Sequence, residues 1–196
     1  MRLYMIRHGQ STANAGRLHA GWAQIPLTEQ GFADARFAGT QLEGLSFDKV
    51  YVSDLLRAIQ TLETALPGVE GERTHLLRET HVGSLSGKDP DQCFALYGQQ
   101  YITDKAARDY TRYGGENMAM HHQRIVEFAD LLAREPVDAV AAFTHEGSIR
   151  CMLNIALGYP HKKEDYPLAN GSVTVFSYEN GTWKLDRLTE GESICS

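Results

Sequence analysis

Short apolar runs that alternate with helical patterns are the feature of this sequence that most constrains its fold. The run Leu3-Tyr4-Met5-Ile6 is nearly continuous, which is typical of a strand buried on both faces of a parallel sheet. Runs at 49–52, 73–77 and 139–143 predict three further strands. Helices are predicted from an N-cap at Thr28 to a stop at Gly44, from an N-cap at Ser53 with Leu55, Leu56, Ile59 and Leu62 facing inward, over 116–134, and around Ile149, Met152, Leu153 and Ala156.

The last two apolar runs predict a hairpin. Residues 173–178 and 182–188 flank Glu179-Asn180-Gly181, and Asn-Gly between β-rich runs is a strong hairpin signal. Alternating strands and helices, closed by an antiparallel pair, predict a three-layer α/β/α sandwich whose sheet is mostly parallel with an antiparallel edge hairpin. With 196 residues and 42% apolar side chains, we expect a single domain over residues 1–196.

Charge, cysteine content and the N-terminal segment exclude several classes of protein. A net charge of −6 argues against a broad nucleic-acid or anionic-lipid surface, so we expect neither partner. Cys93, Cys151 and Cys195 lack metal-ligand spacing and indicate unpaired thiols in a reducing interior. The chain opens directly on a strand pattern rather than a secretion signal, and its most apolar run, 137–143, is too short to span a bilayer. We therefore expect a soluble cytoplasmic protein, and leave open whether it forms a homodimer.

Polar residues follow the predicted strands, at the edge of the sheet where α/β folds bind ligands. His8 comes directly after the first strand. A neutral imidazole can attack phosphorus when one ring nitrogen is held by a hydrogen bond and the other is free, and Gly9 lets the backbone come close enough to hold it. An isolated histidine here would more often simply satisfy a turn, so the hypothesis depends on its neighbours.

Those neighbours are two arginines, a second histidine and an acid. The guanidinium groups of Arg7 and Arg57 could converge on the oxygens of a transferring phosphoryl group, and His145 could donate a hydrogen bond to the same oxygens. Glu79 is placed to protonate a leaving oxygen and later to activate water. Surface arginines and a solvated loop acid are the simpler alternatives for each residue taken alone.

Several blocks of the sequence resemble one family. They are Arg7-His8-Gly9 with Gln10-Ser11 and Asn14, Pro26-Leu27-Thr28 with Gly31, Ser53-Asp54-Leu55-Leu56-Arg57-Ala58 with Gln60-Thr61, Leu77-Arg78-Glu79-Thr80-His81-Val82-Gly83, Gly115-Glu116-Asn117, and Thr144-His145-Glu146-Gly147. Their order and spacing resemble the histidine phosphatase superfamily, which includes the cofactor-dependent phosphoglycerate mutases and many small phosphatases.

The resemblance implies a role for each matched residue. His8 would be the nucleophile, Glu79 the proton donor, and Arg7, Arg57 and His145 the phosphate pocket. Asn14 and Gly9 would also lie at the phosphoryl group. The resemblance implies no metal and no cofactor; His121 and His122, on a predicted helix without a matching carboxylate cluster, are interpreted as histidines of the helix surface.

Three positions depart from the family pattern. Glu146 stands where many members have a second glycine, and a carboxylate there would add negative charge near the pocket. Ser86 stands where many small phosphatases have a glutamate, and Thr80 stands where the mutases usually have an arginine.

The short chain and the threonine at position 80 favour a phosphomonoesterase acting on a small phosphorylated metabolite. A phosphoglycerate mutase is the alternative, and a non-catalytic phospho-ligand-binding relative is a second, which the complete set of site residues argues against. Residues 88–113, rich in tyrosine, lysine and arginine, are the expected lid, although an amphipathic surface helix would have the same composition.

Overall fold

A six-stranded sheet with the order β3-β2-β4-β1-β5-β6 is the centre of this computed structural model, which describes residues 1–159 and 166–188. The strands are β1 (Arg2–Arg7), β2 (Lys49–Ser53), β3 (Glu72–Thr74), β4 (Ala139–Thr144), β5 (Val173–Glu179) and β6 (Thr182–Leu188). The first four in chain order pair in parallel, whereas β5 runs antiparallel to β1 and β6 antiparallel to β5. The predicted mixed sheet is therefore confirmed.

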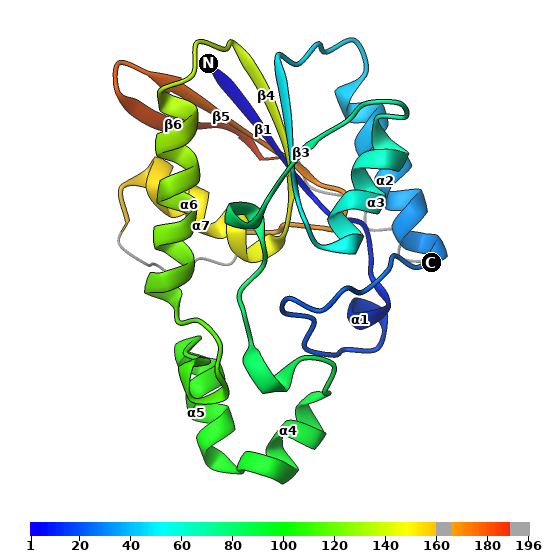
Figure 1. Cartoon of the computed structure of the whole chain (residues 1–196), viewed down its shortest axis with the longest axis vertical. Helices are drawn as coiled ribbons and strands as arrows, with labels where there is room; N and C mark the ends of the chain where they lie inside the picture. Colours follow the sequence, from blue (N-terminus) through cyan, green and yellow to red (C-terminus); the bar gives the residue numbers. More distant parts are fainter. Residues whose placement is uncertain (160–165, 189–196) are drawn as a thin grey trace.

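Helices cover both faces of this sheet (Figure 1). The helices of the described residues are α1 (Thr12–Ala15), α2 (Glu29–Leu42), α3 (Leu56–Ala65), α4 (Pro90–Tyr97), α5 (Gln99–Ala107), α6 (Met118–Ala133) and α7 (Glu146–Leu157). The pair α2 and α3 lies on one face, and α6 and α7 lie on the other. This is the expected three-layer sandwich.

The alternation of side chains along β1 explains why both faces need cover. Leu3 and Met5 pack with α6 and α7, whereas Tyr4 and Ile6 pack with α2 and α3. Leu3, Met5 and Ile6 have no exposed surface. A strand that is apolar on both sides is stable only between two layers, because each face must be removed from water.

The Asn-Gly hairpin forms as predicted. Asn180 and Gly181 have φ values of 52° and 78°, and positive φ at both central residues is what a tight two-residue β-turn of this hand requires. The hairpin closes one edge of the sheet.

Three local predictions are wrong. Ser53 does not cap a helix: it ends β2, and the N-cap of α3 is Leu55, which makes no side-chain capping bond. The inward face of α3 carries Arg57, Ala58 and Thr61 as well as Leu62, because that helix packs against the polar end of the sheet. The third strand ends at Thr74, and the next three residues form a 3₁₀ turn (His75–Leu77).

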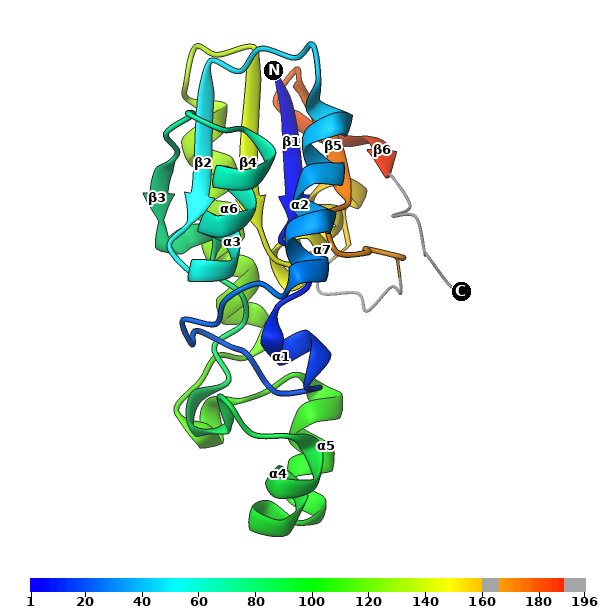
Figure 2. The ribbon, with the colours of Figure 1, turned by 90° about the vertical axis from the view of Figure 1, so that its right-hand side faces the viewer.

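Residues 88–113 lie beyond the carboxyl ends of the parallel strands (Figures 1 and 2). They form α4, α5 and a 3₁₀ turn (Thr111–Tyr113). Their buried side chains Cys93, Tyr101, Tyr110 and Tyr113 pack with Val82 and Leu85 in a small apolar cluster, separate from the two that flank the sheet. This placement fits the lid hypothesis, which rests otherwise on the sequence.

Two further predictions concern thiols and membranes. Cys93 and Cys151 are free thiols, as expected, and Cys195 lies outside the described residues. None of the helices within 1–159 and 166–188 has the length and apolar character needed to cross a membrane.

Candidate active site

The carboxyl ends of β1, β2 and β4 bring the predicted residues together. Arg7 pairs with Thr144 in the parallel register of β1 and β4, so the residues after them, His8 and His145, emerge at the same level. The backbone N–H of His8 donates to the Thr144 carbonyl at 2.9 Å, and the centroids of the two imidazole rings are 5.1 Å apart. Two histidines distant in sequence thus meet because two parallel strands end side by side.

The proton on the His8 ring can be placed from its contacts. Nδ1 lies 2.7 Å from the carbonyl oxygen of Gly9, which can only accept, so Nδ1 carries the hydrogen. Nε2 receives a hydrogen bond from Arg57 Nε at 3.3 Å, which requires an unprotonated Nε2. Burial first, and then the charges of Arg57 and Arg7, hold the pKa of His8 well below its ordinary value. His8 is therefore a neutral imidazole whose nucleophilic lone pair is on Nε2, where it accepts the hydrogen bond of Arg57.

Gly9 is needed for close backbone packing rather than for an unusual φ. A Cβ at this position would lie 2.1 Å from the carbonyl oxygen of Gly31, in the first turn of α2. The N–H of Gly9 donates to Thr61 Oγ1 at 3.1 Å. Both contacts fix the peptide whose oxygen holds the His8 ring.

Arg57 is almost fully buried, with 1% of its surface exposed. Its Nη2 donates to the Gly21 carbonyl at 2.9 Å and its Nη1 to the Ala23 carbonyl at 3.2 Å, so a loop that follows α1 clamps the guanidinium beside His8. Burial lowers the pKa of Arg57 to about 10, with Glu79 opposing and Arg7 adding to that effect. The group stays cationic at neutral pH.

Arg7 is held by protein acceptors. Its Nη1 donates to the Leu168 carbonyl, and its Nη2 forms an ion pair of 3.0 Å with Glu146 Oε2. Glu146 Oε1 also accepts from Arg150, with Nε at 3.0 Å and Nη2 at 2.9 Å. The carboxylate that departs from the family pattern therefore pairs with two arginines at the pocket rather than pointing away.

His145 has no exposed surface and is the N-cap residue of α7. Its Nε2 lies 2.8 Å from Ser53 Oγ, and its Nδ1 is buried without a hydrogen-bond partner among the described residues. Burial and the charge of Arg57 hold the pKa of His145 well below its ordinary value. This explains what Ser53 does in place of capping α3: it fixes the second imidazole.

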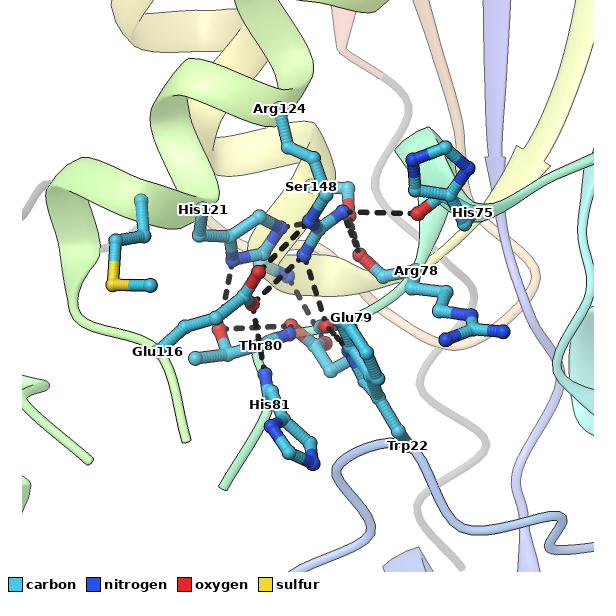
Figure 3. Close-up of polar contacts among 12 residues, drawn as sticks. Trp22, His75, Arg78, Glu79, Thr80, His81, Glu116, His121, Arg124 and Ser148 are labelled. Atoms are coloured by element: carbon cyan, nitrogen blue, oxygen red, sulfur yellow. Dashed lines mark hydrogen bonds and ion pairs between the residues drawn. The ribbon is translucent and has the colours of Figure 1, made fainter. Parts of the chain in front are cut away.

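Glu79 is held at the N-terminus of α7. Its Oε1 accepts from the Thr80 N–H at 2.8 Å, and its Oε2 accepts from the Gly147 N–H at 3.2 Å. A Cβ on Gly147 would lie 2.1 Å from Oε1, so the carboxyl group packs directly on the glycine backbone. Trp22 Nε1 donates to the Glu79 carbonyl at 2.6 Å and fixes the main chain (Figure 3).

A pocket of about 260 Å³ opens over these residues. Arg7, His8, Asn14, Arg57 and Glu79 line it, whereas His145 lies beneath them. Asn14 Oδ1 accepts from the backbone N–H of Ser11 at 3.0 Å, which leaves the Nδ2 amide as the group available to an anion. Of the predicted residues, Gly9 acts only through its backbone.

Sequence reasoning missed part of the pocket lining. His19, Arg108, Tyr110 and Arg150 also line it. Arg108 and Tyr110 come from 88–113, and the basic and aromatic composition of that segment was the only signal that could have indicated them. The guanidinium of Arg108 makes no hydrogen bond or ion pair with the residues the structure describes.

The surface interpretation of His121 is wrong. This side chain is only 3% exposed and lies between Thr80 and Ser148 (Figure 3). Helix α6 turns this face toward α7 and the segment around Glu79, a packing that helical periodicity alone does not reveal. Within the described ranges, no three His, Cys, Asp or Glu side chains are grouped as a metal ion would require.

Known proteins with similar sequences belong to one family. The model of the histidine phosphatase superfamily (branch 1) matches residues 3–191. The chain is 35% identical over 164 residues to a 2,3-bisphosphoglycerate-dependent phosphoglycerate mutase of Brucella canis, covering 77% of this chain and 79% of that protein. For two other bacterial mutases of the same description, the chain spans 65% and 60% of their length, which is less than two thirds.

Solved structures with the same fold include phosphatases. The alpha-ribazole phosphatase of Shigella flexneri superposes with a TM-score of 0.85 at 24% identity, covering 100% of this chain and 99% of that one. A mycobacterial glucosyl-3-phosphoglycerate phosphatase in complex with VO3 superposes with a TM-score of 0.81 at 26% identity, covering 97% and 99%.

Proposed function

The chain belongs to the histidine phosphatase superfamily, and from this premise we propose that it hydrolyses a small phosphorylated metabolite through a covalent phosphohistidine at His8. The observation that carries the proposal is the state of the His8 ring. Nδ1 is held by the Gly9 carbonyl, and Nε2 is unprotonated and accepts a hydrogen bond from the buried Arg57. A neutral, oriented imidazole is the form that attacks phosphorus.

The first half-reaction transfers the phosphoryl group to the enzyme. His8 Nε2 attacks phosphorus, the bond to the ester oxygen breaks, and Glu79 gives that oxygen a proton as it leaves. Arg57, whose hydrogen bond to Nε2 is displaced by the new N–P bond, turns its Nε–H to a phosphoryl oxygen. Charge that spreads over these oxygens is stabilised by donors already in place, at little reorganisation cost.

The second half-reaction releases phosphate. Water attacks the phosphohistidine, Glu79 takes a proton from it, and the N–P bond breaks to restore neutral His8. The remaining donors for the phosphoryl oxygens are Arg7, the Nδ2 amide of Asn14, and the buried Nδ1 of His145, which carries a hydrogen if Ser53 donates to Nε2. This assignment accounts for a buried polar atom that no described residue satisfies.

A phosphoglycerate mutase is the second candidate. The names of the relatives at 35% to 37% identity favour it, and Arg108 in the pocket could bind a second anionic group of a phosphoglycerate. Two features favour hydrolysis. The residue after the acid is threonine rather than arginine. Glu146 pairs with Arg7 and Arg150 and offsets one of their two positive charges, which lowers the net positive charge that a bisphosphate would need.

An assay on several phosphomonoesters separates the candidates. Wild type and His8→Ala are compared on a panel that contains 3-phosphoglycerate with and without 2,3-bisphosphoglycerate, with His75→Ala, an exposed side chain, as the control. We expect phosphate release by wild type and the control and none by His8→Ala. Equal rates for His8→Ala would refute the phosphohistidine, and isomerisation of 3-phosphoglycerate faster than phosphate release would select the mutase.

A further inference from the structure

A chain of hydrogen-bonded polar side chains runs from Glu79 into the interior, and the reaction as proposed does not use it. Thr80 Oγ1 lies 3.3 Å from Glu79 Oε1 and 2.8 Å from His121 Nδ1. The other ring nitrogen of His121, Nε2, lies 3.1 Å from Ser148 Oγ. Figure 3 shows the four side chains in this order, from the segment after β3, from α6 and from α7.

The hydroxyl hydrogen of Ser148 determines which nitrogen of His121 carries a proton. Ser148 Oγ lies 2.8 Å from the Arg78 carbonyl and 3.3 Å from the Leu77 carbonyl. Carbonyl oxygens only accept, so these contacts use the single hydrogen of the hydroxyl. His121 Nε2 must then donate to Ser148 Oγ.

The proton on Nε2 also orients Thr80. Burial, and secondly the charge of Arg124, lowers the pKa of His121 to about 3, so the ring carries one hydrogen at neutral pH. With that hydrogen on Nε2, Nδ1 is an acceptor, and the Thr80 hydroxyl must point its hydrogen at Nδ1 at 2.8 Å. The same hydrogen is then unavailable to Glu79.

We propose that His121 and Thr80 are positioning residues that favour the protonated, proton-donating form of Glu79 by withholding the Thr80 hydroxyl hydrogen from its carboxylate. The inference rests on the proposed function, in which Glu79 is the general acid. Facing Glu79, Thr80 Oγ1 presents only lone pairs. A carboxylate gains nothing from them, whereas a carboxylic acid can donate its O–H to them.

The effect matters because the other surroundings favour the ionised form. The N-terminus of α7 and the N–H groups of Thr80 and Gly147 all stabilise negative charge on Glu79. The titratable and charged groups that face Glu79 or His121 from the packed elements are Arg57, Cys151, Arg108, Tyr110, Glu116, Arg124, His122 and His145. A hydrogen bond donated by the Thr80 hydroxyl would add to this stabilisation of the carboxylate.

The pH profile of His121→Phe tests the proposal. Without an acceptor at Nδ1, the Thr80 hydroxyl turns to Glu79 and stabilises its ionised form. We expect the alkaline limb of kcat/KM to move to lower pH by about one unit, the displacement that one added hydrogen bond to a carboxylate produces. In a Thr80→Val background, where no hydroxyl exists to be released, His121→Phe is expected to move this limb by no measurable amount.

The leaving group supplies a second readout that a merely structural role would not give. At a pH above the shifted limb, His121→Phe should lower kcat/KM about tenfold for an alkyl phosphate, which needs a proton on its leaving oxygen. It should change kcat/KM little for p-nitrophenyl phosphate, whose leaving group needs none. Equal losses on both substrates, or an unmoved alkaline limb, would overturn the proposal.

Two further variants keep the test decisive if His121→Phe fails to fold. Ser148→Ala removes the acceptor that fixes the proton on Nε2, so it should move the limb in the same direction. Ile125→Val, a core residue one helical turn along α6, should leave both readouts unchanged. Nitrogen NMR of histidine-labelled wild type should report the Nε2–H tautomer for His121, and an Nδ1–H tautomer would refute the argument.

Two reference variants separate this inference from the proposed function. His8→Ala should abolish turnover of every substrate, and Glu79→Gln should show the same leaving-group dependence as His121→Phe, but larger. If His8→Ala or Glu79→Gln fails these expectations, the proposed function is wrong. If both behave as expected and the His121 and Ser148 variants do not, only the positioning role is wrong.

Discussion

Acidification from pH 7 to pH 5 should destabilise this protein by at least about 2 kcal/mol, because three histidines are buried in the neutral form. His8, His121 and His145 are 5%, 3% and 0% exposed, and burial is the first cause that lowers the pKa of each. In the unfolded chain all three return to a pKa near 6.5 and bind protons as the pH falls.

The direction and the magnitude of this change in stability follow from the linkage between proton binding and folding. A group whose pKa is lowered on folding contributes stability that is fully present above its unfolded pKa and is lost as the pH falls toward its folded pKa. For His121, whose folded pKa is about 3, the loss between pH 7 and pH 5 is about 2 kcal/mol. His8 and His145, whose pKa values are also lowered by burial, add to the loss in the same direction. Aspartates with lowered pKa values, such as Asp54, act mainly below this window. A typical domain has only about 5–15 kcal/mol of stability, so the loss should be large.

Urea denaturation at pH 7, 6 and 5 measures the effect. Wild type is compared with His121→Gln, which removes one of the three buried groups, and with His75→Gln, whose side chain is exposed. The loss of unfolding free energy between pH 7 and pH 5 should be about 2 kcal/mol smaller in His121→Gln and stay as in wild type in His75→Gln. A stability that is the same at pH 5 and pH 7, or an unchanged slope in His121→Gln, would show that these rings are not held neutral by burial.

Three further predictions concern the site itself. Gly147→Ala should displace the Glu79 carboxyl group, because the new Cβ would lie 2.1 Å from its Oε1. The kcat for alkyl phosphates should then fall at least about tenfold, and adding Glu79→Gln to this variant should cause no further loss. Arg57→Lys should lower kcat/KM by roughly a hundredfold in a steady-state assay, since a single ammonium group does not reproduce a fork that contacts a histidine and two carbonyls; retention of wild-type activity would argue against a role at the phosphoryl group. Glu146→Gln should lower the inhibition constant of inorganic phosphate about two- to fivefold, because Arg7 would no longer have to break its partly exposed ion pair with Glu146 in order to bind phosphate. Weaker inhibition would mean that Glu146 instead holds Arg7 in place.

The strands and most helices could be predicted because their signals are local. The continuous apolar run of β1, the Thr28 cap of α2 and the Asn-Gly turn each depend on neighbours a few residues away. The prediction for Ser53 failed for the opposite reason. A serine before a helical pattern resembles a cap, but its hydroxyl is taken by an imidazole that arrives from β4, 92 residues further along the chain.

For the candidate site, too, local features could be predicted from the sequence and contacts between distant residues could not. The sequence by itself determined that His8 follows a buried strand, that Gly9 is adjacent, and that arginines, a second histidine and an acid follow other strands in the family's order. Only the tertiary structure decided that His121 is buried, that Glu146 pairs with two arginines, and that Thr80 joins the acid to a histidine. The ends of strands can be located from periodicity, because that signal lies in neighbouring residues. Protonation state, ion pairing and burial depend instead on groups that are distant in sequence and close in space. The packing of β1, β4, α3, α6 and α7 around the site therefore sets the chemistry of its side chains.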